Sequence, residues 1–170
     1  MSLSTEFNLV VAGTGSDGLA TFLEAGAPAT LTTPGVVDLA WMWAVAGGHT
    51  LPHAIGAAPT VGRMPGPNGS AFGVVRFPAR SAGKLDVSEL LPDSADGGQE
   101  GNAAMHATDT IDYEIILSGK IDIVLPGNQR RTLKSGDLLV MGGVPHAWEN
   151  IYDEDCTYVF IAIGATRGRA

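Results

Sequence analysis

Hydrophobic and polar positions alternate along much of this chain, and glycine or proline interrupts the alternation every few residues. The segment 103–165 is the clearest case, with short apolar runs separated by turn signals at Ser118-Gly119, 126–128 and Ser135-Gly136. A period of two with turn residues at this spacing predicts β-strands joined by hairpins. Since no helical stretch long enough for parallel crossovers intervenes, we expect an antiparallel sandwich or barrel.

The first hundred residues carry the same signal less regularly. Runs 7–13 and 19–26 predict a first hairpin, run 36–48 predicts a strand, and the sheet resumes at 71–79. Residues 49–70 contain four prolines, together with His49 and His53, and predict a long loop in which either histidine could reach a site. Asp86 or Ser88 can cap one helical turn, and 93–102 reads as exposed loop. We expect one domain, with N-terminal strands and loops over 1–102 and the strand core over 103–165.

Composition narrows the class of protein. A chain of 170 residues, of which 45% are hydrophobic, can bury one core, and two domains would each be marginal. The net charge of −8 and the few scattered basic residues argue against a nucleic-acid partner. Cys156 is the single cysteine and cannot form an internal disulfide, and no run is long and apolar enough to suggest a signal peptide or a membrane span. We expect a cytoplasmic protein without a membrane partner.

Candidate chemistry gathers in the stretch from Met105 to Lys120. Strand alternation places Asp112 and Glu114 on one face and Tyr113 on the other. Periodicity alone leaves open whether the carboxylate face lies in water or points into the protein.

The segment 106–150 resembles the two sequence motifs of the cupin superfamily. In the first motif, His106 takes the first histidine position, Thr108 stands at the second, Asp112 replaces the glutamate, and Gly119 is the closing glycine. The second motif matches at Gly136, Gly143, His146 and Asn150. The two segments are also similar to those of small single-domain cupins of bacteria and fungi, many of which have no defined function.

The resemblance implies an all-β, antiparallel double-stranded β-helix with a jelly-roll barrel and one or two short helical turns. It also implies that Asp112 and Glu114 point into the barrel, together with His146 and Trp148. Two imidazoles and one carboxylate suit a divalent metal such as Fe, Mn, Ni, Zn or Co. The expected ligands are His106, Asp112 and His146, with Glu114 as a possible replacement, because Thr108 removes one histidine.

Further roles follow from this orientation. Glu114, Asp112 and His146 are the catalytic candidates, because each can move a proton. Substrate contacts are expected from Trp43, Arg76, Thr108 and Trp148. An inward Arg76 could pair with Glu114 or bind a substrate carboxylate, and an outward one would lie on a strand surface.

Three functions remain open on the sequence. The first is a metal-dependent enzyme, of lyase, isomerase or dioxygenase type, that acts on a small oxygenated organic molecule, with secondary metabolism as one candidate setting. The second is a metal-free isomerase, cyclase or dehydratase that uses the same residues as acids and bases. The third is a non-catalytic cupin that binds a small ligand. A homodimer is expected as well, because small cupins commonly pair through N-terminal strands and run 7–13 is an apolar edge.

Overall fold

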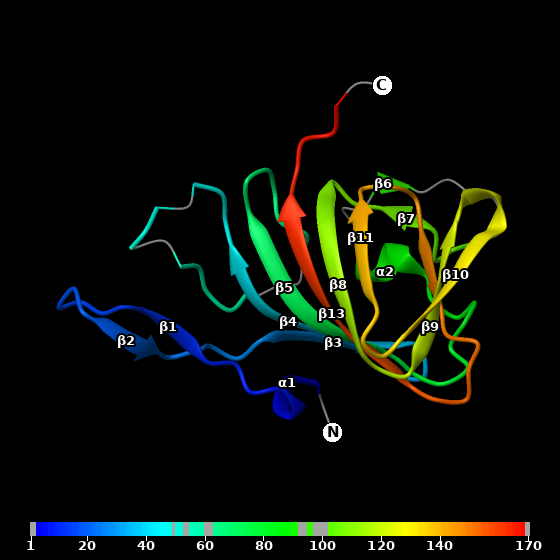
Figure 1. The fold of residues 1–170 in the computed structure, drawn as a ribbon, viewed down its shortest axis with the longest axis horizontal. Helices are drawn as coiled ribbons and strands as arrows, with labels where there is room; N and C mark the ends of the chain where they lie inside the picture. The colour runs from blue at the N-terminus through cyan, green and yellow to red at the C-terminus, as the bar shows by residue number, and fades with distance from the viewer. Residues whose placement is uncertain are drawn as a thin grey trace.

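The chain folds into antiparallel β-sheets that curve around a common interior, as the computed structural model shows (Figure 1). The structure describes residues 3–48, 50–52, 55–59, 63–91, 95–96 and 102–168. Its elements are α1 (Leu3–Glu6), β1 (Val11–Thr14), β2 (Ala20–Leu23), β3 (Ala29–Thr33), β4 (Val37–Val45), β5 (Ser70–Phe77), α2 (Val87–Leu90), β6 (Ala95–Asp96), β7 (His106–Ala107), β8 (Thr110–Ser118), β9 (Lys120–Leu125), η1 (Pro126–Asn128), β10 (Gln129–Lys134), β11 (Leu138–Gly142), β12 (Ala147–Glu149) and β13 (Cys156–Gly164).

The larger sheet has six strands in the order β11-β8-β13-β5-β4-β3, and every neighbouring pair is antiparallel. Strand β13 lies near its middle and pairs with β8 on one side and with β5 on the other. Alternate side chains of β8 are buried and exposed, which follows from the period of two in its sequence.

The smaller layer consists of β10-β9-β12 and the two-residue pair β6-β7. A β-bridge between His106 and His146 joins β7 to the residues that lead into β12, so the two pieces continue one another. This bridge links residues that are far apart in sequence, and it builds part of the site described below.

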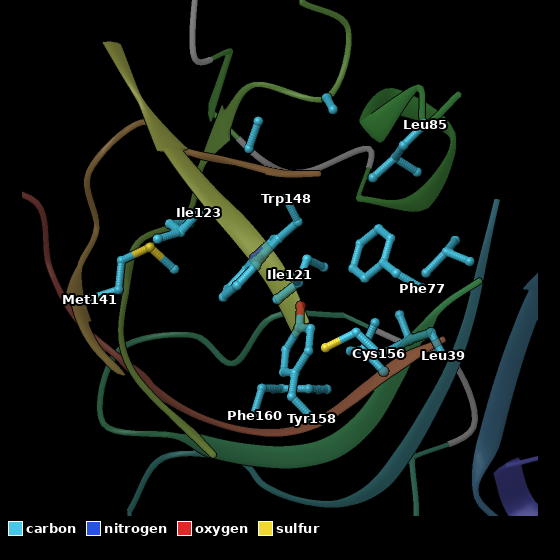
Figure 2. Packing of buried hydrophobic residues seen from close by; sticks show 14 of the residues in the cluster. Leu39, Phe77, Leu85, Ile121, Ile123, Met141, Trp148, Cys156, Tyr158 and Phe160 are labelled. Carbon is cyan, nitrogen blue, oxygen red and sulfur yellow. The ribbon is translucent and has the colours of Figure 1, made fainter. Parts of the chain in front are cut away.

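The core lies between the two layers (Figure 2). Ile116 and Tyr158 contribute from the larger sheet, and Ile121 and Trp148 from the smaller one, all at most 5% exposed. A second, smaller cluster lies on the outer face of the larger sheet, where Leu3 of the N-terminal segment packs with strand residues. This cluster consists of Leu3, Ala40, Met42 and Val74, with Phe7, Leu9, Phe72 and Val159 at its margin.

The all-β, antiparallel fold expected from the sequence is confirmed. The first hairpin is β1-β2, the run 36–48 contains β4, and the strands of the motif region follow the expected turns. The capped helical turn is α2, where the Asp86 carboxylate accepts a hydrogen bond from the Ser88 backbone N–H at 3.1 Å. Strand β3 and helix α1 were not expected, and Ala95–Asp96 was expected as loop but pairs with β7.

One turn requires its glycine. Gly119 joins β8 to β9 with a φ of 70°, and a Cβ at this position would collide with the backbone carbonyl of Asp155. No helix in the described ranges is long and apolar enough to cross a membrane.

Candidate functional site

A cavity of about 80 Å³ lies inside the barrel, between the larger sheet and the smaller layer. Its volume leaves room for several water molecules or a small organic group. Most of its wall is apolar, and the polar side chains come from β7, from Thr108 just after it, from β8, from His146 just before β12, and from β13. The lining residues are Val37, Leu39, Trp41, Met64, Val75, Phe77, Leu85, Val87, Leu90, Leu91, His106, Thr108, Asp112, Glu114, Met141, His146, Trp148, Tyr158 and Phe160.

Two histidines form one wall of this cavity. The backbones of His106 and His146 exchange two N–H···O hydrogen bonds of 2.9 Å, so the residues stand directly opposite each other. Opposite residues of an antiparallel pair point to the same side, which brings the rings together. Their centroids are 4.3 Å apart and the rings are tilted by 50°.

Both histidines are held in one tautomer. The Nδ1 atom of His106 lies 3.0 Å from the Ala104 carbonyl oxygen, and Nδ1 of His146 lies 2.9 Å from that of Val144. A carbonyl oxygen only accepts, so each Nδ1 carries the hydrogen and each Nε2 keeps a lone pair. Burial lowers the pKa of both imidazoles, and with His106 alongside, the pKa of His146 falls to about 3. The pair is therefore neutral and offers two acceptor nitrogens.

Two carboxyl groups from β8 point into the same cavity. Asp112 and Glu114 are each 5% exposed, as the inward orientation of this face requires. The Oδ2 atom of Asp112 accepts a hydrogen bond of 3.0 Å from Thr110 Oγ1, and Thr108 Oγ1 lies 3.5 Å from it. Asp112 Oδ1 and Glu114 Oε2 are buried and have no hydrogen-bond partner within the described part of the chain.

Burial favours the protonated form of these carboxyls. It raises the pKa of Glu114 from 4.5 to about 8, and the nearby charge of Asp112 adds to the effect. The pKa of Asp112 rises less, from 3.8 to about 6, because the threonine hydroxyls partly offset the loss of solvation. At neutral pH the pair therefore holds one proton, mainly on Glu114, and can give or accept it.

Aromatic rings form the remaining walls. Trp41 meets Phe160 edge to face, with ring centroids 4.9 Å apart. Trp148 stacks on Tyr158 with ring centroids 4.8 Å apart, and Figure 2 shows both residues in the core. The Tyr158 phenol is buried, which raises its pKa well above 10, so it is a hydroxyl that can donate a hydrogen bond. Sequence reasoning missed Tyr158, although the alternation of β13 places Cys156, Tyr158 and Phe160 on one face.

Several residues expected at the site lie elsewhere. Arg76 lies outside the cavity, where its guanidinium contacts Glu6 at 2.7 Å and Thr157 at 3.1 Å. It therefore takes the outward orientation and contacts neither Glu114 nor the cavity. Trp43 follows a register shift in β4 and donates a hydrogen bond to the Ile55 carbonyl, so Trp41 lines the cavity instead. His49 and His53 lie outside the described residues.

The donor set fits a divalent metal ion in type but not in number. Two neutral imidazoles with open Nε2 atoms and an unpartnered carboxylate oxygen are suitable donors. In the described ranges, however, no three side chains among His, Cys, Asp and Glu form a group that could hold a metal ion. Thr108 occupies the place of the second motif histidine and contributes a hydroxyl hydrogen-bonded to Thr110 at 2.7 Å. The geometry thus provides a pair of histidine donors rather than a complete three-ligand centre.

Comparisons with known proteins agree with the cupin resemblance. The chain is 46% identical over 50 residues to phomopsin biosynthesis cluster protein C′ of Diaporthe leptostromiformis, a match that covers 29% of this chain and 26% of that protein. It is 32% identical over 56 residues to a cupin-domain-containing oxidoreductase of Neurospora crassa, covering 33% of this chain and 29% of that protein. Each match thus covers less than a third of this chain and less than a third of the curated relative. No protein-family model matches the chain.

The fold has a counterpart among solved structures. The cupin domain of Schizosaccharomyces pombe Cnp3 superposes with a TM-score of 0.50 at 12% identity, over 92% of this chain and 86% of that domain. Together with the strand order and the curated cupin relative, this shows that the chain has a cupin fold, the double-stranded β-helix.

Proposed function

We propose that this protein is a cupin enzyme of secondary metabolism that moves a proton on a small, neutral oxygenated organic molecule inside the barrel. The observation that supports this function is the carboxyl pair of Asp112 and Glu114, which lines an apolar cavity and in which each carboxyl has one buried oxygen without a hydrogen-bond partner among the described residues. A buried carboxyl without a partner costs folding free energy, and such groups concentrate where catalysis needs them.

The composition of the cavity wall supports a neutral substrate. Apart from the proton on Glu114, the polar groups that the described residues offer at the site are mainly acceptors: the two Nε2 atoms and the Asp112 carboxylate. No Lys or Arg occurs among the described residues that line the cavity, so a substrate carboxylate or phosphate would find no countercharge. A molecule with hydroxyl or enol groups supplies the missing donors, and its carbon skeleton can pack against Trp148, Tyr158 and Phe160.

Each residue has a distinct part in the proposed chemistry. Glu114 donates its proton to a carbonyl oxygen, and the ionised Asp112 carboxylate accepts the proton that leaves the adjacent carbon. Asp112, fixed by Thr110, provides the neighbouring negative charge that keeps the Glu114 proton in place. The histidine pair accepts hydrogen bonds from substrate hydroxyls, and Tyr158 donates one. The apolar walls exclude water, which strengthens these polar contacts.

Proton exchange in deuterated water tests this function without knowledge of the natural substrate. We expect the protein, kept in EDTA, to catalyse deuterium incorporation beside the carbonyl of at least one member of a panel of small cyclic diketones, followed by NMR. Glu114→Gln should lose this exchange while retaining the fold. Glu24→Gln makes the same change at an exposed carboxylate outside the cavity and serves as the matched control. Exchange that persists at the wild-type rate in Glu114→Gln would refute the assignment of the proton to Glu114.

Metal-dependent oxidation is the second candidate, and the open Nε2 atoms of His106 and His146 favour it. One curated relative is named an oxidoreductase. A metal bound there would be held by the two histidines and would supply a Lewis acid or a redox centre. Metal analysis of untagged wild type, His106→Ala and His146→Ala distinguishes the two proposed functions. Equal and low metal content in all three proteins would exclude metal-dependent oxidation. Where metal is present, oxygen uptake with diketones and catechols tests the oxidation directly.

A further inference from the structure

A second pocket lies where the two layers of the barrel end in edge strands. Strand β10 is the edge of the smaller layer and β11 is the edge of the larger sheet, and the pocket lies between them (Figure 1). Its volume is about 480 Å³, against about 80 Å³ for the cavity that holds Asp112 and Glu114. Small-molecule sites measure roughly 300 to 1,000 Å³, so this pocket has the size of a ligand site. We call it the outer pocket.

The floor of the outer pocket is apolar because the inward faces of three strands meet there. Leu133 of β10 pairs with Ile121 of β9, a fully buried core residue, so this face of the β9-β10 hairpin points inward. On β11, Met141 pairs with Asp112, which also points into the barrel. The floor consists of Ile123, Leu125, Leu133, Leu139 and Met141.

One charged side chain belongs to the same inward face. Arg131 pairs with Ile123 across the hairpin and stands two positions before Leu133, so strand alternation directs it toward the outer pocket. It is exposed and therefore lies at the mouth of the pocket. The adjacent Arg130 points to the other side of the hairpin, where Asp122 and Glu149 bind it at 3.0 Å and 2.7 Å.

The charge of Arg131 is not compensated within the described ranges. Its Nη1 atom donates a 3.0 Å hydrogen bond to the Arg130 carbonyl oxygen, and no carboxylate of the described residues forms an ion pair with it. Arg76, Arg80, Arg130 and Arg167, in contrast, each pair with a carboxylate. In a chain of net charge −8, an arginine without an acidic partner beside an apolar pocket is available to an anionic ligand.

We propose that the outer pocket binds a monocarboxylate with an apolar body, whose carboxylate pairs with Arg131 and whose hydrocarbon part packs on the floor. The Nε and Nη2 atoms of the guanidinium form a planar fork that can hold both oxygens of a carboxylate. One guanidinium balances one negative charge, which favours a carboxylate over a phosphate dianion. Since Arg131 lies at the exposed mouth, the ligand buries its apolar part and keeps its charge near water.

The outer pocket is separate from the cavity of the proposed proton transfer. Met141 lines both and forms a wall between them, and Figure 2 shows it beside Ile123 at the edge of the core. The inner cavity is too small for this ligand and has no Lys or Arg among its described lining residues. Binding in the outer pocket therefore does not depend on the proposed function.

Isothermal titration calorimetry with octanoate tests this site, and 1-octanol is the neutral probe of the same chain length. We expect wild type to bind octanoate about tenfold or more tightly than 1-octanol. Arg131→Gln should weaken octanoate binding by about tenfold and leave 1-octanol binding unchanged, because only the carboxylate uses the charge. Damage to the fold would instead weaken both probes. Arg80→Gln removes an exposed arginine outside the pocket and should bind octanoate like wild type.

Methyl NMR of labelled methionines locates the bound octanoate. The Met141 methyl signal should shift during the titration, whereas that of Met42, which packs on the outer face of the larger sheet, should stay in place. Met141→Leu assigns the signal by its loss. Both measurements are made without turnover, so they stand whether or not proton exchange is found.

Three results would overturn the proposal. The first is a wild type that does not bind octanoate, or that binds it no more tightly than 1-octanol. The second is an Arg131→Gln variant that loses both probes equally, or a Met141 signal that does not move at saturation. The third is octyl phosphate binding that is about tenfold tighter than that of octanoate, which would replace the carboxylate with a phosphate.

Discussion

Glu114→Gln should stabilise the protein at pH 8 while it removes the catalytic proton. The amide has the shape of the carboxyl group but cannot ionise, so the variant isolates the effect of charge. Glu114 is 5% exposed and lies among apolar cavity walls, which makes the ionised form costly in the folded state.

The size of the effect follows from the two states of the carboxyl group. The unfolded chain binds this proton with a pKa near 4.5, whereas the folded chain binds it with a pKa of about 8. Between these values the folded state carries more protons, so the free energy of unfolding falls as the pH rises. At 1.36 kcal/mol per pH unit, the loss is roughly 2 kcal/mol between pH 6 and pH 8, and roughly 5 kcal/mol in total.

Urea unfolding at pH 6, 7 and 8 in EDTA measures this loss, with tryptophan fluorescence and circular dichroism as probes. The two buried histidines, whose pKa is lowered, add stability with rising pH equally in all three proteins. Wild type and the control Glu24→Gln should therefore share one pH dependence, whereas Glu114→Gln should gain roughly 2 kcal/mol relative to them between pH 6 and pH 8 and should be the most stable of the three at pH 8. Equal pH dependence in wild type and Glu114→Gln would show that Glu114 ionises in the folded protein as it does in water.

Three further substitutions test other parts of the site and its support. Tyr158→Phe retains the stack on Trp148 but removes the hydroxyl, so proton exchange should slow about tenfold with no change in melting temperature; an unchanged rate would remove Tyr158 from the chemistry. Thr108→His restores the second motif histidine in the cavity. Elemental analysis should then find at least tenfold more bound metal, and an unchanged metal content would indicate that the three histidines cannot bind one ion together. Asp122→Ala removes the carboxylate that accepts hydrogen bonds from Arg130, Thr132 and Tyr152. The free energy of unfolding, measured in urea, should fall by about 3 kcal/mol. A fall below about 1 kcal/mol would mean that water replaces the carboxylate.

The sequence determined which stretches become strands and which side chains of a strand share a face. Alternation is a local property, since successive residues of a strand point to opposite sides whatever the partner strand is. The inward direction of Asp112 and Glu114 relative to Tyr113 could therefore be predicted, and the same argument applied to β13 would have found Tyr158. The resemblance to cupins added the choice of which face points inward.

Only the tertiary structure decided which distant residues meet. His106 and His146 are 40 positions apart, and their contact depends on one long-range bridge that no local pattern specifies. The sequence left both orientations of Arg76 open, and in the structure it points outward, where Thr157 on the neighbouring strand and Glu6 of the N-terminal segment accept its hydrogen bonds. The shortage of hydrogen-bond donors in the cavity likewise depends on side chains that several strands contribute. The same holds for the outer pocket between β10 and β11. A sequence period fixes the direction of a side chain, but burial and partners depend on which other elements the fold places beside it.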